Sequence, residues 1–342
     1  MTVSPAEDQV GVPETDGREP PASAAGGFFK ALLFKEWPKR RRLLALSGVG
    51  VLLAFLLYYP VGAWRVHVID DDPSFASAES PQGQSRAVTA AAALIHREID
   101  QHGWTPNRPL FMPAAILVAM PNFQKGITAM IGCFAIGMDQ RIGRLAKEGG
   151  AVADDDLARA ATLLQYPPDV WMINPREPWA RTLSSEKQYR NAGRSFEAYN
   201  RRLADGLATF DRRPDVLGAV LLRFAKELEA TADRLDAPIG DASGWFGGAA
   251  DGLYYDGKGR AYAALLLLRG LGEDAADVLT ARGLTEAWTA MLGSLAAAAT
   301  PRPWVVLDGG SASMLVPNHL AVQGYHLLRA RSRLSELAEA LR

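Results

Sequence analysis

LLALSGVGVLLAFLLYYPVGAW, residues 43–64, decides the architecture of this chain. None of these 22 residues is charged. As a helix they would reach about 33 Å, which matches a hydrocarbon core roughly 30 Å thick. Tyr58, Tyr59 and Trp64 lie at the far end, where amphipathic aromatic rings favour the headgroup region. We therefore predict one transmembrane helix, Leu43–Trp64, in contact with membrane lipid.

The charges on either side of this segment predict its direction. Lys39–Arg42 precede it and Asp70–Asp72 follow it. Basic flanks stay in the cytoplasm, where they also bind anionic lipid. The N-terminus is therefore expected in the cytoplasm and the bulk of the chain outside it.

A cleaved signal peptide is the alternative, because Val61-Gly62-Ala63 fits a small-residue cleavage site. However, 42 residues precede the apolar run, and the run exceeds the usual h-region of about 7–15 residues. We favour the anchor over cleavage after Ala63.

Composition divides the rest of the chain into three further parts. Residues 1–27 are rich in Pro, Gly, Ala and acids, which predicts a disordered cytoplasmic tail. Residues 28–42 mix aromatic and basic side chains, as in a segment that lies on the inner leaflet. Residues 65–342 are expected to form a helical periplasmic domain. This part of the chain, after Trp64, has 30 basic and 32 acidic residues. It has no excess of basic charge, so nucleic-acid binding is not predicted.

The strongest helical pattern runs from Ser185 to Asp211, where apolar residues recur at spacings of three and four. A second amphipathic stretch, Leu217–Leu235, follows Pro214, and the two together predict an antiparallel helical hairpin. Phe123–Lys147 has too short an apolar run to span a membrane, so we predict a buried core helix. Cys133 lies in that run and is expected to be a small buried apolar residue.

A small β-hairpin is predicted near the C-terminus, because Trp304–Leu307 and Ser313–Val316 flank Asp308-Gly309-Gly310. Leu253–Tyr255 is a candidate for an extra strand. Glycines in Gly240–Arg260 predict a surface loop that covers the core, or a binding lid. The expected fold class is mostly α: one N-terminal transmembrane helix and an extracytoplasmic helical hairpin or bundle with this β-hairpin.

Few residues form a pattern that predicts catalysis. His96, His102, His319 and His326 lack the spacing of a metal site, so no metal or other cofactor is predicted. Ser184-x-x-Lys187 lacks the companion motifs of an acyl-enzyme, and Ser184 is interpreted as a helix cap.

The stretch from Tyr166 to Trp179 combines four prolines with two tryptophans. Packing onto the helices is the simpler interpretation. The alternative is a binding surface for glycan or peptide, with Asp100 or Glu98 as an acid. The candidate residues of that surface are Glu98, His102, Trp104, Trp171 and Trp179.

Several short phrases occur in a distinctive order along the chain. They are His102–Asn107, Met120–Gln124, Tyr166-Pro167, Asp169–Trp171, Gly259–Ala263, Pro303–Val306, Pro317–Ala321 and Tyr325–Arg331. In these phrases the chain resembles the proteobacterial inner-membrane family known only as domain of unknown function 2333, over roughly Leu43–Arg342. The resemblance implies a bacterial inner-membrane protein with a periplasmic domain, and it implies no activity and no catalytic residue.

The leading hypothesis is therefore a non-enzymatic envelope component that binds another envelope protein through its helices. Its basis is long amphipathic helices, a tether and no convincing catalytic set. An envelope glycan-binding protein or hydrolase is the alternative.

Overall fold

A computed structural model describes residues 38–75, 81–147, 153–173, 179, 182–236, 248–303, 306 and 318–342. Two compact units, Met1–Tyr58 and Tyr59–Arg342, divide the chain. The described residues are mostly helical and contain no β-strand. The predicted tail, most of the interfacial segment and the predicted β-hairpin, except Val306, lie outside the described residues.

Helix α2, Lys39–Val66, contains the predicted transmembrane segment. Of the described helices it is the one long and apolar enough to cross a membrane, and none of its most apolar stretch is buried. Pro60 lies inside the helix near its C-terminal end.

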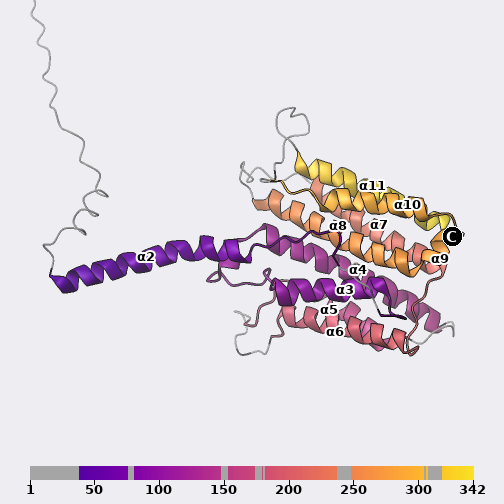
Figure 1. Cartoon of the computed structure of the whole chain (residues 1–342), viewed down its shortest axis with the longest axis horizontal. Helices are drawn as coiled ribbons and strands as arrows, with labels where there is room; N and C mark the ends of the chain where they lie inside the picture. The colour runs from indigo at the N-terminus through magenta and orange to yellow at the C-terminus, as the bar shows by residue number, and fades with distance from the viewer. Residues whose placement is uncertain are drawn as a thin grey trace, which may run out of the picture. The chain divides into compact units, whose positions relative to one another are not determined.

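The second unit is a bundle of helices that run back and forth (Figure 1). Two short turns, η1 and η2, precede α4, and the longer helices are connected by loops at the two ends of the bundle. The elements are α3 (Arg86–His96), η1 (Arg97–Gln101), η2 (Pro113–Ile116), α4 (Ala119–Lys147), α5 (Asp155–Leu163), α6 (Ser185–Ala204), α7 (Pro214–Asp236), α8 (Gly248–Asp274), α9 (Ala276–Ala281), α10 (Thr285–Ala299) and α11 (His319–Ala340).

Helix α8 lies at the centre of this bundle and contacts α3, α4, α7, α10 and α11. Its sequence explains the position, because residues 261–268 read AYAALLLL and are all buried. A helix that is apolar on every side is stable only inside a protein. Gly126 of α4 and Gly259 of α8 let the two backbones approach: a Cβ on either would overlap a carbonyl oxygen of the other helix.

Three predictions about this unit are wrong. Leu253–Tyr255 is part of α8 and forms no strand, and residues 248–260 are helical where a surface loop was expected. The helices at 185 and 214 exist, but they do not pair as a hairpin: α6 packs against α3 and α5, and α7 against α11 and α4. Each helix buries its apolar face against those partners. The buried core helix predicted at Phe123–Lys147 is confirmed as α4.

Candidate functional site

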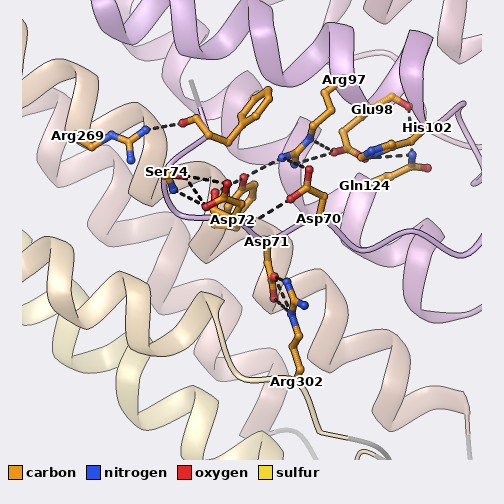
Figure 2. Close-up of polar contacts among 12 residues, drawn as sticks. Asp70, Asp71, Asp72, Ser74, Arg97, Glu98, His102, Gln124, Arg269 and Arg302 are labelled. Carbon is orange, nitrogen blue, oxygen red and sulfur yellow. Dashed lines mark hydrogen bonds and ion pairs between the residues drawn. The ribbon is translucent and has the colours of Figure 1, made fainter. Parts of the chain in front are cut away.

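A linker segment, residues 67–75, follows α2 and crosses the bundle surface, and Asp71 is its buried residue. Only 2% of Asp71 is exposed, and its carboxylate accepts hydrogen bonds from Lys258 Nζ at 2.6 Å and Arg302 Nε at 2.8 Å. Lys258 lies on α8 and is 0% exposed. The linker is therefore attached to the central helix by a buried ion pair, and Figure 2 shows Arg302 facing the same carboxylate.

The two charges of this pair depend on each other. Burial would raise the pKa of Asp71, but the hydrogen bonds and charges of Arg302 and Lys258 hold it below its ordinary value. Burial lowers the pKa of Lys258, and Asp71 opposes that change. Removing Asp71 would leave the buried ammonium of Lys258 without a carboxylate partner, which is strongly destabilising.

A second buried charge, Arg97, also holds the linker. Its guanidinium donates to Tyr262 Oη at 2.9 Å, pairs with Asp70 at 3.3 Å and lies 4.3 Å from the centre of the Phe75 ring. Burial alone would lower the pKa of Arg97, but Glu98, Tyr262 and Asp70 raise it, so the side chain stays protonated. Linker residues 70 and 75 are therefore both fastened to one cation (Figure 2).

The π-helical turn η1 places Arg97 and Glu98 side by side in the core. His102 N donates to Arg97 O at 2.9 Å across this turn. Glu98 is fully buried and contacts the Arg97 guanidinium at 2.8 Å, Gln124 Nε2 at 3.3 Å and His102 Nδ1 at 3.5 Å. Gln124 also accepts hydrogen bonds from Thr105 N and Oγ1. We call the buried residues Asp71, Arg97, Glu98 and Lys258, with their more exposed partners Asp70 and Arg302, the buried ionic cluster.

The structure places the predicted glycan-binding residues in unlike surroundings. Trp104 is 0% exposed; its Nε1 donates to Pro168 O at 2.9 Å and its ring packs edge-on to Tyr189. Glu98 and His102 do meet, but the Glu98 carboxylate is buried. Trp171 is half-buried, and Trp179 is 84% exposed. Trp104 and Glu98 therefore present no surface to a sugar, and their role in this structure is packing and pairing.

Asp100, the other candidate acid, lies on the surface of a shallow groove between α3 and α6. It accepts hydrogen bonds from Arg190 Nε at 2.7 Å and pairs with His96 Nδ1 at 3.0 Å. Burial would raise the pKa of Asp100, but Arg190 and His96 lower it overall. A general acid near neutral pH requires a raised pKa, so this carboxyl is poorly suited to the predicted role of acid in glycoside hydrolysis.

The cluster residues Arg97, Lys258 and Arg302 were not predicted as a site. The available signal was a charged residue next to an apolar stretch: Lys258 lies three residues before the start of the buried run at 261–268, and Arg97 follows an alanine-rich helix. Asp70–Asp72 was used only to predict direction across the membrane. The sequence did not distinguish Asp71, which is buried, from Asp70 and Asp72, because burial depends on which helix the linker crosses.

No family model, no curated protein and no solved structure matches this chain. The resemblance to domain of unknown function 2333 therefore stays a prediction.

Proposed function

We propose that this protein is a non-enzymatic scaffold of the bacterial inner membrane. In this proposal α2 anchors the chain, and the helical bundle lies in the periplasm, where it binds another envelope protein. The observation that supports it best is the buried ionic cluster. A flexible tether would not need a buried ion pair between the linker that follows α2 and the central helix of the bundle. The cluster instead makes the linker part of the folded bundle.

The partner surface that we propose is not on α6 or α7. The apolar residues of α6 and α7 that were expected to face a partner, such as Phe196 and Phe224, are buried in the core. Helix α11 instead exposes Val322, Tyr325 and Leu328, which recur every third residue on its outer side. We propose this stripe as the contact with the partner protein.

In-cell photocrosslinking tests the proposal. A photoreactive amino acid replaces Tyr325 in the full chain, and the matched control is Leu207 in the loop after α6, which is 73% exposed against 59% for Tyr325. We expect one discrete crosslinked band from position 325, in the membrane fraction, and none from position 207. Identical patterns from both positions would contradict a specific partner on α11.

A further inference from the structure

An exposed apolar surface lies on the loops that join α3 to α4 and α5 to α6. The first loop contributes Leu110, Phe111 and Ile116, and the second contributes Met172 and Ile173. Leu110 is 85% exposed, and each of the other four is more than half exposed. We call these five residues the end-loop apolar surface.

The two loops form one surface although they are far apart in the sequence. Trp104 Nε1 donates to Pro168 O and Asn107 Nδ2 donates to Val170 O, both at 2.9 Å. The rings of Phe111 and Trp171 pack edge-on, with centroids 6.0 Å apart. These contacts hold the exposed residues beside one another on a rigid base.

This surface lies directly beside the last turns of α2. Tyr59 Oη donates to Leu110 O at 2.8 Å, and Ala63 is buried. Gly62 is so close to the ring of Pro113 that a Cβ would overlap it. Leu110 therefore lies at the level of Tyr59, five residues before the apolar segment of α2 ends at Trp64.

The chemistry of the surface is that of a membrane interface. No charged residue occurs between Arg108 and Lys125, or from Val170 to Ile173. A contiguous exposed apolar surface is unfavourable in water. Aromatic and long aliphatic side chains are stable at the boundary between headgroups and acyl chains. Continuity with the end of the membrane helix favours lipid as the occupant.

We infer that the end-loop apolar surface inserts into the interfacial layer of the bilayer that α2 crosses. The inference rests on the proposed anchor. It adds that the chain contacts the membrane through these loops as well as through α2.

Depth-dependent quenching of a fluorophore tests this. Full-length protein with Cys133→Ala is labelled with nitrobenzoxadiazole at Leu110→Cys, Ile173→Cys or the control Leu207→Cys. It is reconstituted in vesicles of phosphatidylethanolamine and phosphatidylglycerol that contain doxyl-labelled phosphatidylcholine. The control follows the C-terminal end of α6, whereas Val170 accepts a hydrogen bond from Ser185 at the N-terminal end, about 30 Å away along the helix.

Labels at positions 110 and 173 are expected to show a blue-shifted emission and a loss of intensity to the doxyl lipid. The label at 207 should be quenched by iodide instead. If the labels at 110 and 173 are quenched like that at 207, while the protein still floats with the vesicles, the inference is overturned and the anchor stands. If they are shielded from both quenchers, protein rather than lipid covers the surface, which also overturns it. Loss of flotation would overturn the anchor itself.

Discussion

The buried ionic cluster and the end-loop apolar surface both depart from the usual arrangement of a folded domain, and in opposite directions. The cluster places charges in the core: Lys258 and Arg97 are buried beside Asp71 and Glu98. The surface places apolar side chains such as Leu110 in contact with solvent. In soluble proteins both a buried charge and a large exposed apolar patch call for an explanation.

Both regions lie next to the last turns of α2 or the linker that follows, and this position explains both. The linker that follows α2 supplies Asp70 and Asp71 to the cluster, and the last turns of α2 pack on the loop that contains Leu110. The charges fasten the bundle to the linker that leaves α2, whereas the apolar loops have the chemistry that the proposed lipid contact requires. Under the proposed anchoring by α2, the comparison teaches that the region beside α2 is organised around a membrane rather than around water.

The largest expected effect comes from breaking the cluster. Asp71→Ala removes the partner of the buried Lys258 ammonium, and we expect a loss of about 3–5 kcal/mol in the free energy of unfolding. Asp72→Ala is the matched control, because the Asp72 side chain is exposed and bonds only locally to Ser74. Denaturant unfolding of the full chain in detergent measures both. Equal losses in the two variants would mean that the Asp71–Lys258 pair does not stabilise the fold.

A smaller effect separates the buried tryptophan from the exposed one. Trp104→Phe removes part of a fully buried ring and the donor to the part-buried carbonyl of Pro168, and we expect a loss of about 1–3 kcal/mol. Trp179→Phe alters an exposed ring, so its effect should stay within about 0.5 kcal/mol. Thermal unfolding of both variants provides the check. A Trp104→Phe protein as stable as the parent would reopen a binding role for this residue.

The pH dependence of stability should show two carboxyl groups acting in opposite directions. Asp71 has a folded pKa below its ordinary value, so its stabilisation is present above that value and is lost as the pH falls through the folded pKa. Burial raises the pKa of Asp274, against hydrogen bonds from Ser85 and the first residues of α3. Its contribution is therefore greatest at low pH and is lost as the pH rises through the folded pKa.

We accordingly expect Asp71→Asn to flatten the decrease in melting temperature between pH 5 and pH 3, and Asp274→Asn to steepen it. The two variants are measured in the same buffers, so that effects of acid on the rest of the chain cancel. A change of the same sign in both would contradict the opposite pKa shifts.

The smallest effect belongs to the apolar loops. Leu110→Ser removes an exposed side chain, so the unfolding free energy in detergent should change by less than about 0.5 kcal/mol. A large loss of stability in detergent would show that Leu110 supports the fold itself.

Apolar periodicity was sufficient to predict the helices α4, α6 and α7, but not which helices pair. Apolar periodicity correctly predicted α6 and α7, because it depends only on residues near one another in the chain. It could not show that α7 packs on α11, since neighbours in sequence need not be neighbours in a bundle. The glycines at 257 and 259 suggested a loop; instead Gly259 lies at the crossing of α8 with α4.

The candidate site was predicted less well for the same reason. Trp104 and Glu98 were singled out for residue type, and their burial depends on contacts with Tyr189 and Gln124 from other helices. The uncharged stretch from Pro109 to Gln124 was visible in the sequence. Its position beside Tyr59 was not, because 51 residues separate Tyr59 from Leu110.

Protease accessibility of the intact chain in a Gram-negative host tests the central claim most directly. The account predicts that a C-terminally detected chain stays in membranes washed at alkaline pH and keeps the mass of a protein that includes Leu43–Trp64. Protease added to spheroplasts should digest the bundle, whereas in intact cells the bundle should be protected. A soluble chain that begins at Trp64, or a bundle that resists protease in spheroplasts, would contradict the anchor and its direction.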